Sequence, residues 1–287
     1  MDIRTPAFHR LLEIWLDEDL GRGDLSAKAI PSKPRSAYWL AKEAGIFSGG
    51  IFAECIFKRL DNRVEIKHLI KDGEKFCPNQ KLLEIHGPGA ALITGERPAL
   101  NLAMHLSGVA TATKELTKEL QGTKVRLADT RKTTPGLRML EKYAVQCGGG
   151  INHRLGLDDA AMLKENHIAW SEDIEQAVLA IKESAPWPAR IIVEAETIEQ
   201  AEEAVLAGAD GILLDEMTPM SLHALVPRLR DLARARIASK GPNQIVIEAS
   251  GINPLHLKAY AETGVDLIST SAPITKSSWI DLSMRFS

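Results

Sequence analysis

The sequence predicts an α/β protein in which a compact α+β unit precedes an open or shortened βα barrel of six or seven strands. Strand-like and helix-like runs are mixed irregularly in the first part of the chain and alternate regularly in the second. The alternating part has roughly 170 residues, well under the ~250 typical of an eight-unit barrel. We therefore expect two domains, at residues 1–110 and 111–277, with the tail 278–287 packing on the first.

The first domain is expected to combine helices with a few strands. Apolar residues at helical spacing predict a helix at 6–18, and the glycine-rich GRGDLS at 21–26 predicts a turn after it. The patterns that follow predict strands at 36–42, 63–70 and 81–87 and a helix at 51–60. A helical pattern then runs from Thr94 to Leu120, with Gly108 as a candidate break.

The second domain shows short apolar runs separated by amphipathic segments. The runs lie at 124–128, 160–164, 190–195, 211–215, 244–249 and 266–270. Helical patterns such as 172–184 and 197–209 lie between them. Repeated βα units joined by right-handed crossovers form a parallel sheet that curls into a barrel.

Composition excludes several classes of function. The chain has 35 basic and 38 acidic residues and a net charge of −3, which gives no general attraction to nucleic acid or to an anionic membrane. Its three cysteines have spacings that fit neither a disulfide framework nor a zinc site. Charges interrupt the apolar residues of the N-terminal segment, so we expect no signal peptide or membrane span. A cytoplasmic location is the expectation.

Polar residues follow nearly every apolar run of the second domain. In chain order they are Asp129 with Arg131 and Lys132, then Lys164, Glu194, Asp215, Ser250 and Ser271. The carboxyl ends of parallel strands gather at the face where such barrels place their active sites. We therefore expect these side chains to meet in one pocket, although they are spread over the whole domain.

The charges of this set indicate its ligand. The basic members, with nearby side chains, suit a ligand that carries several negative charges: Arg131, Lys132, Arg138, His153, Arg154 and Lys164. Glu194 and Asp215 are the exceptions. Two carboxylates beside a phosphate site are a usual way to hold Mg²⁺, and the same pair could stabilise positive charge on a sugar ring.

Residue chemistry alone leaves alternatives open. Arg131 and Lys132 could be a solvated pair in a loop, and Lys164 could form a surface ion pair with Glu165. Lys164 could also be the Schiff-base lysine of a barrel aldolase. A barrel that binds a phosphorylated metabolite without turnover is another alternative. Arg97 receives no role from residue chemistry, because it follows no predicted strand.

The block DTRKTTPGLRMLEKYAVQCGGGINHRLGLDDAAMLKENHI at 129–168 resembles the quinolinate phosphoribosyltransferase family, also called carboxylating nicotinate-nucleotide pyrophosphorylases. The resemblance extends from 18–26 through 95–111 and 211–217 to 261–269. It implies an N-terminal α/β sandwich domain and a C-terminal open α/β barrel. It also implies transfer of the phosphoribosyl group of phosphoribosyl pyrophosphate to quinolinate with Mg²⁺, giving nicotinate mononucleotide, pyrophosphate and CO2 in NAD biosynthesis.

The resemblance also implies roles for individual residues. The quinolinate carboxylates would be held by Arg131, His153, Arg154 and Lys164, with Lys132 and Lys164 near the phosphoribosyl donor. Glu194 and Asp215 would serve Mg²⁺ and the ribose. Arg97 matches a family arginine that reaches into the site of a neighbouring subunit, in a homodimer or in a hexamer built as a trimer of dimers.

The chain departs from the family pattern in two loops. Ser250-Gly251-Ile252 is one glycine short of the usual Ser-Gly-Gly, Ser271 replaces a glycine, and Lys276 stands where a histidine is common. These loops would bind the 5′-phosphate through backbone N–H groups, so Ser250, Gly251 and Ser271 are expected there. The altered loops leave a related phosphoribosyltransferase of the molybdenum-transport type as a rival.

Overall fold

The computed structural model describes residues 2–30, 33–171, 173–236 and 241–286. The chain divides into two compact units, each discontinuous in sequence. Unit 1 comprises residues 1–114, 133–149 and 273–287, and unit 2 comprises 115–132 and 150–272. Among the described residues, no helix has both the length and the apolar character needed to cross a membrane.

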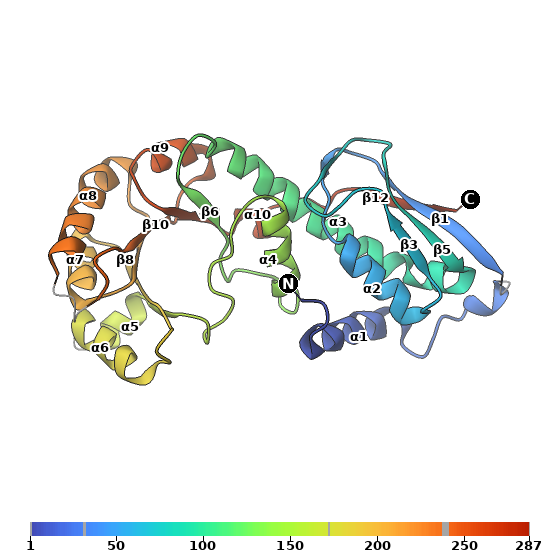
Figure 1. Cartoon of the computed structure of the whole chain (residues 1–287), viewed down its shortest axis with the longest axis horizontal. Coiled ribbons are helices and arrows are strands. Elements are labelled where there is room, and N and C mark those ends of the chain that lie inside the picture. The colour runs from blue at the N-terminus through green and yellow to red at the C-terminus, as the bar shows by residue number, and fades with distance from the viewer. Residues whose placement is uncertain (1, 31–32, 172, 237–240, 287) are drawn as a thin grey trace. The chain divides into compact units, whose positions relative to one another are not determined.

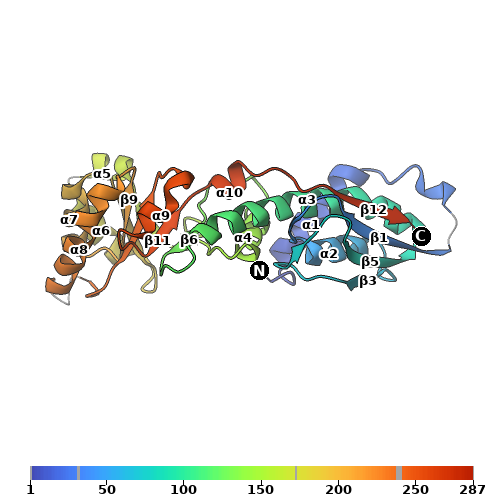
Figure 2. The same ribbon diagram turned by 90° about the horizontal axis from the view of Figure 1, so that it is seen from above.

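Unit 1 is built on a four-stranded antiparallel sheet in the order β12-β1-β5-β3. Its strands are β1 (Pro34–Ala41), β3 (Glu65–His68), β5 (Lys81–Pro88) and β12 (Leu282–Phe286), beside the short pair β2 (Gly45–Ile46) and β4 (Lys75–Phe76). Figures 1 and 2 show α2 and α3 alongside this sheet. The described helices of this unit are α1 (Pro6–Leu20), η1 (Ala27–Ala29), α2 (Gly50–Leu60), α3 (Gly89–Glu119), α4 (Arg138–Cys147) and α10 (Ala272–Thr275), of which α3 and α10 extend past the unit's limits.

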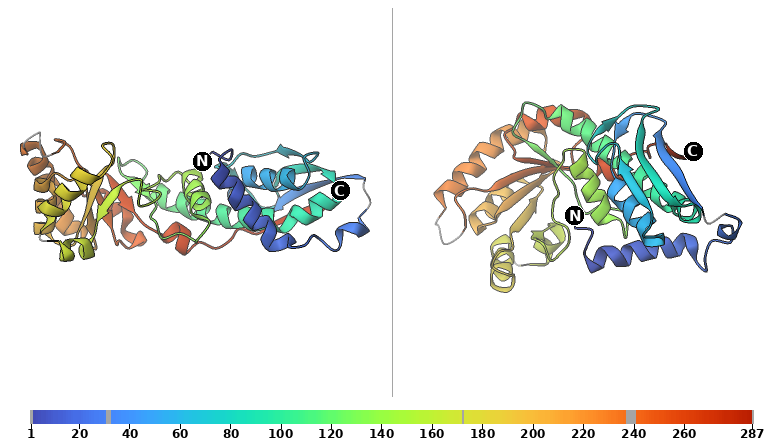
Figure 3. Two further views of the ribbon diagram at one scale, coloured as in Figure 1. Left: turned by 90° about the horizontal axis from the view of Figure 1, so that it is seen from below. Right: turned by 45° about the vertical axis from the view of Figure 1, so that its right-hand side comes forward.

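The core of unit 1 forms because alternate residues of β1 face the helices. Ala37, Trp39 and Ala41 are buried, whereas their neighbours along the strand are partly exposed. They pack in one cluster with Phe8 of α1 and Phe52 of α2. In the right-hand view of Figure 3, α1 lies beside α2.

Helix α3 is continuous from Gly89 to Glu119 and corrects two expectations. It starts at Gly89, earlier than the expected Thr94, and Pro98 lies inside the helix. Gly108 does not break it. A Cβ at Gly108 would collide with the backbone of Ser278, so the glycine serves the close approach of the C-terminal segment.

Unit 2 contains the expected open barrel, a six-stranded parallel sheet in the order β6-β11-β10-β9-β8-β7. The strands are β6 (Arg126–Ala128), β7 (Ala161–Leu163), β8 (Ile191–Ala195), β9 (Gly211–Asp215), β10 (Val246–Ser250) and β11 (Leu267–Ser269). The six runs predicted from sequence are therefore all strands. Strands β6 and β7 end the sheet order, which confirms that the barrel is open.

Helices cover the outer side of this sheet (Figure 1). They are α5 (Glu165–Trp170), α6 (Ile174–Ser184), α7 (Ile198–Ala207), α8 (Pro219–Ala235), η3 (Pro254–His256) and α9 (Leu257–Ala261). Helix α7 begins at a capping box of Thr197 and Gln200 and ends at Gly208, whose φ of 93° suits glycine. Its buried face, with Ala204 and Val205, packs in the second core. These packed crossovers hold all six carboxyl ends at one edge.

The division into units differs from the sequence-based boundaries in the segment 133–149, which belongs to unit 1. Helix α4 lies there, and its Leu140, Ala144 and Val145 are buried in the first core. The hydrophobic effect of these side chains assigns the segment to unit 1 although it interrupts the barrel sequence. The C-terminal segment also joins unit 1, because β12 pairs antiparallel with β1.

Candidate active site

A cavity of about 320 Å³ lies at the carboxyl edge of the sheet in unit 2. Eight residues expected at the site line it: Arg131, Lys132, His153, Arg154, Lys164, Glu194, Asp215 and Ser250. They come from β8, β9 and β10 and from the loops or termini next to β6 and β7. The parallel sheet thus brings together side chains that lie far apart in sequence, as predicted.

Strand geometry explains why these side chains face the cavity. Successive residues of a strand point to opposite faces, so residues two apart share a face. Leu213 and Asp215 of β9 both line the cavity, as do Glu248 and Ser250 of β10. In β9, Ile212 and Leu214 point the other way and are fully buried.

Lys164 and Glu194 form a close ion pair inside the cavity. Lys164 Nζ donates to Glu194 Oε2 over 2.5 Å, and the Glu194 side chain is only 12% exposed. Pairing compensates the desolvation of both charges. The predicted surface pair of Lys164 with Glu165 is therefore replaced by a pair that faces the cavity.

Asp129 fixes the loop that carries His153 and is itself nearly inaccessible. Its two carboxylate oxygens accept hydrogen bonds from Asn152 Nδ2 at 2.7 Å and from the backbone N of His153 at 2.8 Å. Asp129 is 1% exposed, and its carboxylate lies between β6 and the loop 150–154. Asp129 is thus a positioning residue for the loop.

Glu248 is a further carboxylate of the cavity, and the sequence reasoning missed it. Its Oε2 lies 3.2 Å from His153 Nε2, while its Oε1 is buried without a hydrogen-bond partner. His153 Nδ1 accepts from the backbone N of Arg154, so the neutral imidazole carries its proton on Nε2 and donates it to Glu248. The alternation of β10 was the available signal, because Glu248 precedes Ser250 by two residues.

Arg154 is the most deeply buried cation of the cavity. It is 9% exposed, and its Nη1 donates to the carbonyl of Ala160 at 2.9 Å. Burial and the nearby charge of Arg131 lower the pKa of the Arg154 guanidinium, while Glu194 acts in the opposite direction. Two guanidinium groups that repel each other in a partly dry cavity favour a multivalent anion between them.

The ends of β9 and β10 are tied together by an unusual turn. Glu216 has a φ of 54°, which is rare for a residue other than glycine, and its N–H donates to the carbonyl of Ser250. Gly251 has a φ of 67°, and a Cβ there would crowd Asp215 and Glu216. Backbone strain of this kind concentrates at functional sites.

Four expected residues do not line this cavity. Among the described residues that line it, Gly251 and Ser271 are absent. Arg97 belongs to unit 1, on α3, with a side chain 68% exposed and 3.7 Å from Glu96. Arg138 also belongs to unit 1, where its Nε donates to Thr133.

Comparison with known proteins agrees with this geometry. Residues 24–107 match the N-terminal domain of the quinolinate phosphoribosyl transferase family model, and residues 109–285 match its C-terminal domain. The chain belongs to the quinolinate phosphoribosyl transferase family.

Two curated members and one solved structure illustrate the similarity. The chain is 43% identical to a probable carboxylating nicotinate-nucleotide pyrophosphorylase of Synechocystis sp., covering 96% of this chain and 90% of that protein. It is 42% identical to the protein of the same name from Bacillus subtilis, covering 96% and 92%. The nicotinate-nucleotide pyrophosphorylase of Francisella tularensis superposes with a TM-score of 0.88 at 34% identity, covering 99% and 98%.

Glu194 and Asp215 are the two carboxylates expected to hold Mg²⁺ with a substrate. No group of three or more His, Cys, Asp or Glu side chains in the described ranges is arranged to hold an ion. Glu194 and Asp215 face the same cavity. Mg²⁺ is usually held by one or two carboxylates plus substrate phosphates and waters, so this donor set suits it.

Proposed function

We propose that this chain transfers the phosphoribosyl group of phosphoribosyl pyrophosphate to quinolinate and releases pyrophosphate and CO2, giving nicotinate mononucleotide for NAD biosynthesis. Membership of the family supports the reaction, and the match covers nearly the whole chain. The observation that carries it is the convergence of five basic or imidazole side chains and four carboxylates, Glu194 and Asp215 among them, in one cavity.

The basic residues suit the two anionic substrates. Arg131, Arg154 and His153 offer N–H donors for the two carboxylates of quinolinate, and planar guanidinium groups can bind a carboxylate through two hydrogen bonds. Lys132 and Lys164 would act as point charges toward the phosphoribosyl donor. Holding both substrates in line lowers the entropic barrier to the bond that forms between the ring nitrogen and the anomeric carbon.

Glu194 and Asp215 are proposed to hold Mg²⁺ together with the donor's pyrophosphate and to stabilise the positive charge that develops on the ribose. Bound there, Mg²⁺ would neutralise charge on the leaving pyrophosphate. The ion pair of Glu194 with Lys164 supports this proposal, because Lys164 holds the carboxylate in the cavity.

Decarboxylation would follow transfer. Ribosylation makes the ring nitrogen cationic, and the cationic ring accepts the electron pair left when the bond to CO2 breaks. A proton then replaces CO2 on the ring carbon. The protein's part is to position the ring and to limit water around it, which the low exposure of Arg154, His153 and Glu248 supports.

A radiometric or chromatographic assay tests the reaction directly. The protein is incubated with quinolinate and phosphoribosyl pyrophosphate, with and without Mg²⁺, and nicotinate mononucleotide and CO2 are measured. Formation of both products in equal amounts, with Mg²⁺ required, is the expected result. A mononucleotide without CO2 would instead indicate the molybdenum-transport type of enzyme.

We further propose a homodimer, or a hexamer of such dimers, in which Arg97 enters the site of the partner subunit. Its exposed side chain supports this role. Arg97→Ala and Lys164→Ala chains are each expected to be inactive alone. Unfolded and refolded together, they should regain about a quarter of wild-type activity, because half of the dimers are mixed and each has one intact site. Mixtures that stay inactive would contradict the exchange of Arg97.

A further inference from the structure

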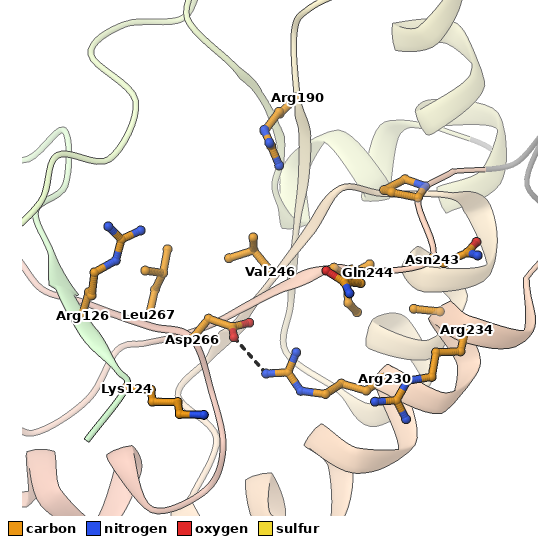
Figure 4. Close-up of a pocket in the computed structure, with 13 residues that line it drawn as sticks. Lys124, Arg126, Arg190, Arg230, Arg234, Asn243, Gln244, Val246, Asp266 and Leu267 are labelled. Atoms are coloured by element: carbon orange, nitrogen blue, oxygen red, sulfur yellow. Dashed lines mark hydrogen bonds and ion pairs between the residues drawn. The ribbon is translucent and has the colours of Figure 1, made fainter. Parts of the chain in front are cut away.

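A second cavity, of about 770 Å³, lies at the opposite end of the barrel strands. Residues at the amino ends of β6, β8 and β10 line it, together with one face of α8 (Figure 4). Five of its lining side chains are basic: Lys124, Arg126, Arg190, Arg230 and Arg234. We call these five residues the amino-edge cluster. The carboxyl-edge cavity contains none of them.

The amino-edge cluster carries more positive charge than its surroundings neutralise. Asp266 is the one acidic residue among those described as lining the cavity, and it accepts from Arg230 Nη2 at 3.0 Å. Arg230 also donates to the carbonyl of Gly264, so this pair is part of the scaffold. Arg234 pairs at 3.0 Å with Asp231, and both of these side chains are largely exposed.

The other three cations have no carboxylate partner within 4.0 Å among the described residues. They are Lys124, Arg126 and Arg190. Figure 4 shows Arg126, Arg190 and Arg230 on three sides of the space around Val246. The chain as a whole has a net charge of −3, so the positive charge of this cluster is opposite in sign to the net charge of the protein. A concave site of one charge sign concentrates counter-ions of the other sign.

The fold holds these cations in fixed places. Lys124 and Arg126 lie at the start of β6, and Arg190 lies directly before β8. Arg230 and Arg234 are one turn apart on α8 and therefore project from one face of that helix. Neutral donors, Asn243 and Gln244, extend the same wall. An anion can thus be contacted from several elements at once, as a multivalent anion requires.

The cavity continues into the barrel. A neighbouring space of about 520 Å³ shares Arg126 and Arg190 with it. That space is lined by apolar side chains such as Pro188 and Ile192, and it also reaches His153, Arg154 and Glu248, which line the carboxyl-edge cavity. Guanidinium groups with apolar side chains beside them suit a small phosphorylated compound at the amino-edge mouth.

We propose that the amino-edge cluster binds a small anion with two or more linked phosphates, at the end of the barrel strands opposite the active-site cavity. Guanidinium groups match phosphate oxygens, and several of them around one cavity favour a diphosphate over a single carboxylate. The compound that supplies these linked phosphates is inorganic pyrophosphate or a nucleoside polyphosphate. A nucleoside would place its base against Ile192.

Calorimetry can isolate this site from the active site. The full chain carrying Arg131→Ala and Lys132→Ala, which removes two cations of the active-site cavity, is titrated with inorganic pyrophosphate and, separately, with a nucleoside diphosphate. We expect one pyrophosphate to bind per chain. Adding Arg190→Ala and Arg234→Ala should raise the Kd about tenfold or more, because two charge-assisted contacts are lost. Tighter binding of the nucleoside diphosphate would identify a nucleotide as the ligand, and equal binding would identify the inorganic anion.

A charge-matched control separates a site from a general charge effect. Arg228→Ala with Lys258→Ala also removes two cations from exposed positions of unit 2, one of them on α8, but neither residue lines the cavity. The Kd should then change less than about twofold. Equal weakening by both double variants, or no binding in the parent variant, would overturn the proposal. If circular dichroism shows that the variant with Arg190→Ala and Arg234→Ala is unfolded, Lys124→Glu repeats the test at a position outside the helix. Because no turnover is measured, the result is independent of the proposed reaction.

Discussion

The two units differ in the side chains from which they build their cores. The core of unit 1 is rich in aromatic residues: Phe8, Trp39, Phe47, Phe52, Phe57 and Phe76 are all fully buried. The core of unit 2 consists of Val, Ile, Leu and Ala, with Tyr260 and Met217 as its only larger members among the described residues. Short parallel strands covered by helices favour such branched and small side chains.

This difference suggests that the core of unit 1 mainly determines stability, whereas the carboxyl edge of unit 2 mainly determines activity. Large aromatic rings bury much apolar area per residue, so unit 1 can be held by its core alone. Unit 2 uses the carboxyl ends of its strands for charged side chains, which contribute nothing to an apolar core. We therefore expect substitutions in unit 1 to change stability, and substitutions at the carboxyl edge of unit 2 to change activity.

Lys164→Ala should give the largest effect on activity. It removes the ammonium that lies 2.5 Å from Glu194 and leaves that carboxylate without its partner in the cavity. Turnover should fall about 10³-fold, on the order of 4 kcal/mol in the barrier. Thermal unfolding measured by calorimetry should shift by only a few degrees.

Reduction with borohydride tests whether Lys164 forms a Schiff base with a substrate. A Schiff-base lysine needs a pKa lowered by an apolar pocket or by nearby cations, whereas Lys164 faces a carboxylate. Treatment of the wild-type protein with borohydride and substrate should therefore leave Lys164 unmodified in the mass spectrum. A reduced adduct on Lys164 would restore the aldolase alternative.

Phe52→Ala should give the largest effect on stability. Phe52 is fully buried, 5.3 Å from the ring centre of Tyr143 and 5.8 Å from that of Phe8. Loss of the ring should lower the free energy of unfolding by about 3 kcal/mol. Urea unfolding measures it, with Phe52→Leu as the control, for which we expect about half that loss.

The comparison between units breaks down if the Phe52→Ala protein loses activity while still folded. Its kcat and KM should stay near wild type at temperatures well below the melting transition. A folded protein with strongly reduced kcat would mean that the aromatic core of unit 1 also tunes the chemistry of unit 2.

Glu248→Leu should act on substrate binding. It removes the acceptor 3.2 Å from His153 Nε2. The KM for quinolinate should rise about tenfold, the equivalent of about 1.4 kcal/mol. Glu248→Gln retains an acceptor oxygen and should raise KM less. Equal KM values in both variants and the wild type would show that His153 needs no orientation by Glu248.

Most of the fold followed from sequence because hydrophobic periodicity and strand order act locally. All six barrel strands coincide with the apolar runs to within one residue at their carboxyl ends, and polar residues at or after these ends meet because parallel strands end at one edge. Glu248 was missed because it lies inside β10, where a charge contradicts the apolar pattern, and attention to strand ends overlooks it. Segment 133–149 was assigned to the barrel because no local signal shows that α4 packs in the other core. The amino-edge cluster was missed because its five cations come from three separate segments.

The smallest predicted effect concerns Glu141 of α4, which belongs to unit 1. Burial alone would raise the pKa of Glu141, but hydrogen bonds from His105 and Thr134 outweigh it and hold the pKa below 4.5. A carboxyl group whose folded pKa is below its unfolded value stabilises the protein fully above pH 4.5, and this contribution is lost as the pH falls through the folded pKa. Glu141→Gln should therefore lower the free energy of unfolding by about 1 kcal/mol at pH 7 and flatten its decline in acid. Urea unfolding at several pH values from neutral to acid measures both. If the free energy of unfolding falls with pH equally in the two proteins, other carboxylates cause the loss of stability in acid.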